Sequence, residues 1–122
     1  MEIAPNVYWF DTGGSNVYLV VEPAAVVLVD TGMPRKHGAI FNFLQTLGHA
    51  PTDLTHILVT HADMDHVGSL AAIHQASGAQ VWAGAASAQL ISGGKSPRHM
   101  PRLVQWIIDT FMKYGAVAQD KI

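Results

Sequence analysis

Four side chains able to bind a metal ion fall within six residues, between a predicted strand and a predicted helix. They are His61, Asp63, Asp65 and His66. Imidazole favours zinc, iron, nickel or copper, and carboxylates add the oxygen ligands that harder ions prefer. Proteins of the α/β class place their sites where strands end and helices begin. The segment therefore predicts a metal centre in an α/β fold.

The spacing of these side chains bears on how many ions they would hold. In extended backbone, residues i, i+2 and i+4 point to the same side, so His61, Asp63 and Asp65 would converge. His66 would enter the following helix and point elsewhere. This geometry suits two neighbouring metal ions better than one.

Three of the four residues also have a purely structural explanation. Asp65 would cap a helix that begins near His66. His61 would bind a buried backbone carbonyl, and Asp63 would be a solvated loop residue. Because all four occur together at one strand-to-helix junction, the metal centre is the favoured interpretation.

The rest of the chain alternates between strand and helix patterns. Strands are expected at residues 7–10, 17–21, 25–29, 54–60 and 80–82. Helices are expected near residues 34–47, 67–76, 85–91 and 101–114. Residues 25–29 are apolar throughout, as in a strand covered on both faces. This order of elements predicts an antiparallel meander leading into an α/β layered architecture.

Composition limits the class of protein. A chain of 122 residues with 13% charged side chains supports one folded domain, residues 1–122. The first residues show no signal-peptide pattern, and a cytoplasmic location is expected. A net charge of -2 gives no indication of a basic surface for nucleic acid or an anionic membrane. The absence of cysteine excludes a disulfide scaffold and a cysteine nucleophile.

Residues 60–69 (THADMDHVGS) resemble the metal-binding signature of the metallo-β-lactamase-fold hydrolases, written His-x-His-x-Asp-His. Upstream, residues 28–32 (LVDTG) are similar to that family's strand ending in Asp-Thr-Gly, and residues 16–20 (NVYLV) to its early meander. The resemblance covers about residues 1–90. It implies an αββα sandwich, of which this chain would supply the first half: a mixed sheet with helices on one face.

The resemblance also implies a role for each residue of the motif. His61 and Asp63 would bind a first metal ion, and Asp65 and His66 a second. Asp65 would be the catalytic residue, because it would also orient the bridging hydroxide. Asp30 would stand behind the ligands and brace their loop, as carboxylates commonly do around metal sites.

Two departures from the family pattern change these expectations. Asp63 stands where the signature has its second histidine, which adds negative charge. Zinc remains the expected metal, up to two ions, with manganese or iron as alternatives. The family's later ligands, two histidines and an aspartate, have no counterpart before Ile122, so we expect an incomplete first half of the fold.

The other histidines are expected to be structural. His74 lies eight residues beyond His66, about 12 Å along a helix axis, which is too far to share an ion. His99 could approach the site from a turn. His37, His49 and His56 have no neighbouring ligand pattern.

The expected function is that of a metal-dependent hydrolase. Hydroxide supplied by the metal would attack an ester, lactone, thioester, amide or phosphodiester of a small-molecule substrate. The alternatives are a non-catalytic metal-binding or self-associating module and a truncated fragment. If helices cover only one sheet face, the other face would be apolar, and we expect self-association or a second half to cover it.

Overall fold

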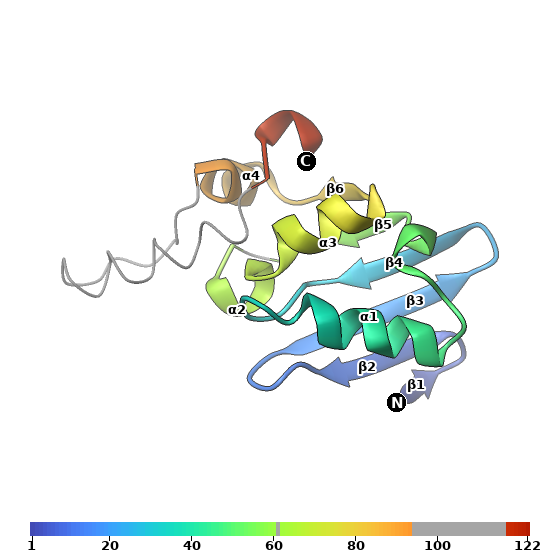
Figure 1. The fold of residues 1–122 in the computed structure, drawn as a ribbon. Coiled ribbons are helices and arrows are strands. Elements are labelled where there is room, and N and C mark those ends of the chain that lie inside the picture. Colours follow the sequence, from blue (N-terminus) through green and yellow to red (C-terminus); the bar gives the residue numbers. More distant parts are fainter. Residues whose placement is uncertain (61, 94–116) are drawn as a thin grey trace.

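The computed structural model describes residues 1–60, 62–93 and 117–122. Within them, six strands form one sheet and lie side by side in chain order (Figure 1). The strands are β1 (Glu2–Ala4), β2 (Val7–Asp11), β3 (Asn16–Glu22), β4 (Ala25–Val29), β5 (His56–Leu58) and β6 (Gln80–Trp82). Strands β1 to β4 form the antiparallel meander, whereas β4, β5 and β6 run parallel to one another.

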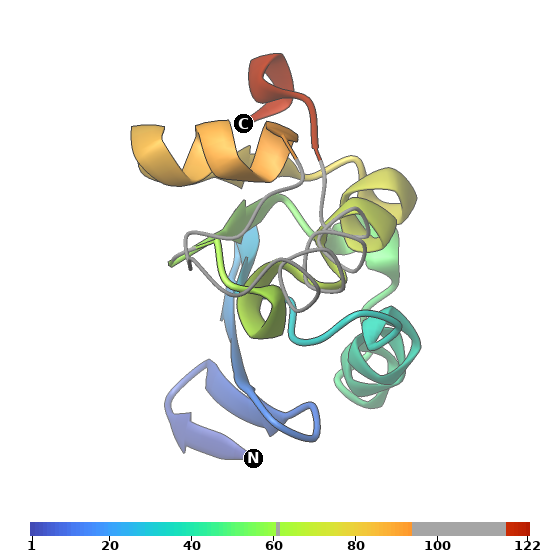
Figure 2. The same cartoon turned by 90° about the vertical axis from the view of Figure 1, so that its left-hand side faces the viewer.

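Helices provide the crossovers that the parallel strands require. The helices are α1 (His37–Thr46), α2 (Met64–Val67), α3 (Leu70–Ser77) and α4 (Ala85–Gly93), with single 3-10 turns at η1 (Pro51–Asp53) and η3 (Gln119–Lys121). Helices α1 and α3 cover the same face of the sheet, as the side view shows (Figure 2). This mixed sheet with helices on one face confirms the predicted α/β class.

The hydrophobic core lies between the sheet and these two helices. Alternate residues of the strands face it, because successive strand side chains point to opposite sides. Fully buried members come from β3, β4, β5, α1 and α3, and they include Leu19, Leu28, Ile57, Ile40, Leu44, Leu70 and Ile73. Burial of this apolar surface is the main stabilising term for a chain with few charges.

The strand at residues 25–29 differs from its prediction in one respect. Val26 and Leu28 are buried against the helices, but Val27 and Val29 are only half-buried on the other face. Within the described residues, the expectation of a strand covered on both faces was therefore wrong. On that second face, Leu58 and Trp82 are 40% and 56% exposed and pair across β5 and β6.

Several element boundaries also differ from the sequence expectations. Helix α1 begins at His37 rather than at Pro34, and β5 is shorter than residues 54–60. The helix expected over residues 67–76 is α3, which begins at Leu70, and a second short helix, α2, lies where a loop was expected before it. Strand β1 was not predicted. The helix expected at residues 101–114 lies outside the described residues.

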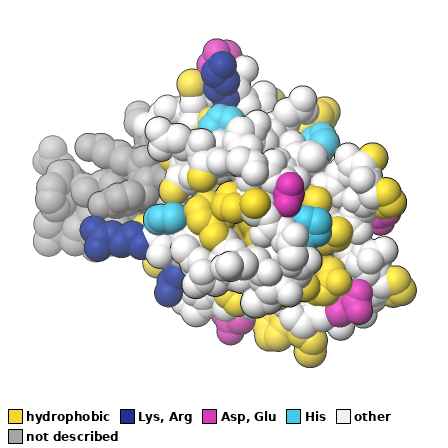
Figure 3. Space-filling model, turned by 45° about the vertical axis from the view of Figure 1, so that its right-hand side comes forward, with side chains coloured by type: hydrophobic (Ala, Val, Ile, Leu, Met, Phe, Trp, Pro, Cys, Tyr) yellow, Lys and Arg dark blue, Asp and Glu magenta, His cyan; other side chains and the backbone are white. Residues whose placement is uncertain are grey.

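The surface carries few charges. From a direction turned 45° from Figure 1, hydrophobic side chains gather near the centre of the view and charged ones are scattered (Figure 3). Across the part of the chain that the structure describes, no helix is long and apolar enough to cross a membrane.

Candidate metal centre

The candidate centre lies where two neighbouring parallel strands end. Asp30 directly follows β4, and the motif segment follows β5. The backbone N–H of Asp30 donates to the carbonyl of Leu58 at 2.8 Å, which continues the β4–β5 pairing by one residue. The two loops therefore leave the sheet side by side, at the edge where α/β proteins bind their ligands.

The buried carboxylate of Asp30 joins the two loops. The side chain accepts hydrogen bonds from the Thr60 backbone N–H at 2.9 Å and the Thr60 hydroxyl at 2.7 Å. It also receives the His66 Nδ1–H at 2.7 Å. With only 4% of Asp30 exposed, these bonds offset the cost of removing a carboxylate from water. The predicted proximity of Asp30 to the motif is confirmed.

The backbone of Asp30 adopts a conformation that few residues take. Its φ angle is 64°, in the left-handed region, where aspartate and asparagine are tolerated better than most side chains. This turn brings the carboxylate back over the end of β5. The residue type is thus constrained by the backbone as well as by its hydrogen bonds.

The contact with Asp30 fixes the chemical state of the His66 ring. A carboxylate only accepts hydrogen bonds, so Nδ1 carries the proton that is shared with Asp30. Nε2 lies 3.4 Å from the Asp65 carboxylate. A histidine held by a carboxylate through one nitrogen is the usual arrangement of a metal ligand.

The two aspartates of the motif differ from their sequence expectations. Asp63 occupies the N-cap position of α2 and is 8% exposed, so it is not a solvated loop residue. Asp65 lies in the first turn of α2 and does not cap it. Because the helix begins at Met64, extended alternation ends at Asp63. Asp65 Oδ2 lies 3.4 Å from His66 Nε2, so the prediction that His66 points elsewhere was wrong.

The side chains of the candidate centre have the chemistry of metal ligands. An imidazole nitrogen and a carboxylate oxygen converge at His66 and Asp65, which is a combination that zinc, iron and manganese accept. His61, the first predicted ligand, lies outside the described residues. Among residues 1–60, 62–93 and 117–122, no three His, Cys, Asp or Glu side chains are grouped to hold an ion.

Two threonines in the centre escaped the sequence prediction. Thr60 binds Asp30 through both its amide and its hydroxyl. Thr31 donates from its backbone N–H at 2.8 Å and from its hydroxyl at 2.9 Å, both to the His66 carbonyl. Thr31 lies inside residues 28–32 and Thr60 inside residues 60–69, the segments that carry the resemblance, but the resemblance gave neither threonine a role.

The remaining described histidines have structural contacts, as expected. His74 Nδ1 lies 2.9 Å from the Ala79 carbonyl, and His49 lies 3.4 Å from Asp53. His56 contacts the hydroxyl of the preceding residue at 2.8 Å, and the His37 ring packs edge-on against an aromatic ring of α1. His99 lies outside the described residues.

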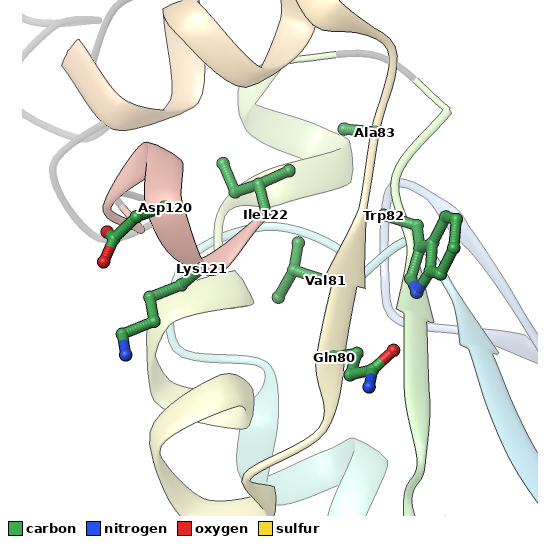
Figure 4. Close-up of a pocket in the computed structure, with 7 residues that line it drawn as sticks. All are labelled: Gln80, Val81, Trp82, Ala83, Asp120, Lys121 and Ile122. Atoms are coloured by element: carbon green, nitrogen blue, oxygen red, sulfur yellow. The ribbon is translucent and has the colours of Figure 1, made fainter.

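A separate pocket of about 340 Å³ lies between β6 and the C-terminal residues. Its lining residues are Gln80, Val81, Trp82, Ala83, Asp120, Lys121 and Ile122. Val81 and Ile122 lie on the same side of β6, whereas Trp82 points to the other side of the strand (Figure 4). None of these residues belongs to the candidate centre.

Comparison with known proteins assigns the chain to a family. The family model described as the metallo-beta-lactamase superfamily matches residues 10–104. This chain belongs to the metallo-beta-lactamase superfamily. The match includes Asp30 and the whole motif segment. Members of this superfamily typically bind metal ions, often zinc.

Relatives and solved structures agree with this assignment. The mouse metallo-beta-lactamase domain-containing protein 1 is 40% identical over 65 residues, which are 53% of this chain and 25% of that protein. The Bacillus subtilis probable metallo-hydrolase YflN is 33% identical over 72 residues, 57% of this chain and 27% of that protein. The chain thus spans about a quarter of the length of the curated relatives it matches.

Two solved structures are similar in backbone as well as in sequence. A Cronobacter sakazakii metallo-beta-lactamase with a HARLDQ motif superposes with a TM-score of 0.73 at 31% identity, over 79% of this chain and 38% of that one. The subclass B3 metallo-beta-lactamase BJP-1 of Bradyrhizobium japonicum gives 0.70 at 38% identity, over 75% and 35%.

Proposed function

We propose that this superfamily member contributes to the active centre of a metal-dependent hydrolase. The bond broken would be that of an ester, lactone, thioester, amide or phosphodiester in a small molecule. One observation carries the proposal: His66 Nδ1 lies 2.7 Å from the Asp30 carboxylate, and His66 Nε2 lies 3.4 Å from the Asp65 carboxylate. A histidine held through one ring nitrogen by a carboxylate is the usual arrangement of a metal ligand, and Asp65 places a second candidate ligand beside the other nitrogen.

The residues of the motif would share the work. His66 Nε2 and the carboxylates of Asp63 and Asp65 would bind metal, together with His61 as the family resemblance implies. When bound, the metal ion supplies Lewis-acid activation of water at neutral pH. Asp30 keeps the His66 ring in one tautomer and one orientation. Asp65, 42% exposed in its side chain, can accept a hydrogen bond from the attacking water and orient it.

We propose zinc as the metal, in a centre of up to two ions, with manganese or iron as alternatives. The additional carboxylate of Asp63 supports the alternatives, because oxygen ligands favour harder ions. Its burial supports a role beyond solvation, since only 8% of Asp63 is exposed.

Metal analysis of the purified chain tests this assignment. The wild-type chain is incubated with zinc, manganese or iron(II) and then desalted. Elemental mass spectrometry should then find metal bound to the chain. His61→Ala, Asp65→Ala and His66→Ala should each reduce bound metal severalfold or more. His74→Ala is the matched control, because His74 already contacts a backbone carbonyl, and it should retain metal.

Hydrolysis is measured on the same samples, with a nitrophenyl ester, a lactone and a nitrophenyl phosphodiester. Turnover that rises with added metal and falls in Asp65→Ala is the expected result. Equal metal content in the wild type and in Asp65→Ala would contradict the ligand assignment. Metal uptake with no turnover of any substrate would instead support the alternative of a binding module.

A further inference from the structure

Ser69 is a buried polar residue that the mechanism above does not use. It stands at the break between α2 and α3, three residues after His66, and is 1% exposed. Its hydroxyl donates to the Met33 carbonyl at 2.6 Å and accepts from the Lys36 backbone N–H at 2.9 Å. One side chain thus joins both ends of the turn that follows the LVDTG motif to the segment that carries His66.

The contact between these two segments extends beyond Ser69. A Cβ atom added to Gly68 would lie 2.4 Å from the Met33 carbonyl carbon and 2.3 Å from the Pro34 nitrogen. The two backbones therefore touch. Further along, Thr31 donates twice to the His66 carbonyl. The turn after β4 thus supports residues 66–69, and Ser69 closes the far end of the contact.

We propose that Ser69 is a positioning residue for His66. Its hydroxyl uses both its donor and its acceptor capacity inside the protein, so removing it leaves two buried backbone groups without their partner. The turn would then loosen from α2, the Thr31–His66 bonds would weaken, and the imidazole would lose its fixed place on Asp30. The importance of this positioning for metal binding rests on the proposed function, but the positioning itself does not.

Nuclear magnetic resonance on the metal-free chain at pH 8 tests this inference. Long-range proton–nitrogen spectra report the tautomer of the His66 ring, and amide exchange reports the Thr31 N–H. In Ser69→Ala, Thr31 exchange should accelerate about tenfold or more, and the ring should lose its single Nδ1-protonated state. Amides of Val20 and Val27 in the β3–β4 ladder should stay within about twofold of wild type.

Ser77→Ala is the matched control at the other end of α3. Ser77 also binds backbone, accepting the Ala79 N–H at 3.1 Å, but it does not contact the turn after β4. It should change neither readout. If Ser69→Ala does not fold, Ser69→Cys gives the test, because it keeps the size and weakens the hydrogen bonds.

Two results would overturn the inference. The first is an unchanged His66 spectrum and Thr31 exchange rate in a folded Ser69 variant. The second is equal acceleration at Thr31, Val20 and Val27, which would mean that Ser69 stabilises the whole domain and does not position His66. Failure of the wild-type chain to bind metal would contradict the proposed function and leave this test unaffected.

Discussion

At the scale of single residues, Asp30 makes the hydrogen bonds that join the two loops of the candidate centre. Its two carboxylate oxygens receive three donors, two from Thr60 and one from His66. Asp30→Asn keeps the left-handed backbone and the shape, but turns one acceptor into a donor. One of the donors from Thr60 or His66 then faces an N–H of the new side-chain amide and has no acceptor. We expect the free energy of unfolding, from urea titration, to fall by about 1–3 kcal/mol.

Asp53→Asn is the control for this change. Asp53 also accepts a backbone N–H and lies beside a histidine, but its side chain is 48% exposed. Exposed pairs contribute little, so the loss there should stay below about 1 kcal/mol. Equal losses in the two variants would mean that burial of Asp30 has no energetic consequence, contrary to the geometry described.

The sequence predicted the residues of metal-binding type but not the residues that form hydrogen bonds around them. The motif placed Asp65 and His66 in one site because of their chemistry and spacing. The hydroxyls of Thr31, Thr60 and Ser69 could not be found in this way, since serine and threonine occur in many turns and their partners are distant in the chain. The side-by-side placement of Asp65 and His66 was missed because it depends on where α2 begins.

At the scale of secondary-structure elements, Gly68 marks where α2 ends and the chain turns towards α3. The close approach of the Met33–Pro34 backbone leaves no room for a side chain. Gly68→Ala should therefore destabilise the domain by about 1–3 kcal/mol, as overpacking does in cores. The measurement is the midpoint of thermal or urea unfolding, with circular dichroism to show that the variant folds.

Gly38→Ala is the opposite case within the same protein. Gly38 lies in α1, and a Cβ there meets nothing within 4 Å. Alanine favours the helix over glycine by up to about 1 kcal/mol, so this variant should be equally or more stable than wild type. If both alanine substitutions changed the free energy of unfolding in the same direction, the packing of Gly68 against the turn would be contradicted.

The elements that sequence predicted well are those set by local pattern. Residues 25–29 are a short apolar run and residues 80–82 a short segment of strand-forming type, and both are strands with those limits. The break between α2 and α3 is different, because the apolar periodicity continues through it. At that break, Gly68 and Ser69 contact Met33 and Pro34, which are more than thirty residues away in the chain. Contacts between residues so far apart cannot be predicted from the local sequence pattern.

At the scale of the whole molecule, the sheet is covered unequally. Helices α1 and α3 pack on one face. The opposite face carries Leu58 and Trp82, which are register partners and largely exposed. Apolar patches of this kind on isolated domains usually mark an interface. The sequence predicted an uncovered apolar face from the shortage of helices. Among the described residues, the exposure of Leu58 and Trp82 supports a proposal about what covers it.

We propose that a second copy covers this face when the chain is alone in solution, and we expect reversible self-association in sedimentation velocity experiments. The double variant Leu58→Gln with Trp82→Gln should weaken association about tenfold or more, because removing buried apolar area costs roughly 25 cal/mol per Å². Ile3→Gln is the control, since Ile3 is 51% exposed but lies on β1 at the other edge of the sheet. A wild-type chain that stays monomeric at all concentrations, or an equal effect of Ile3→Gln, would contradict the assignment of the interface to the β5–β6 end of the sheet.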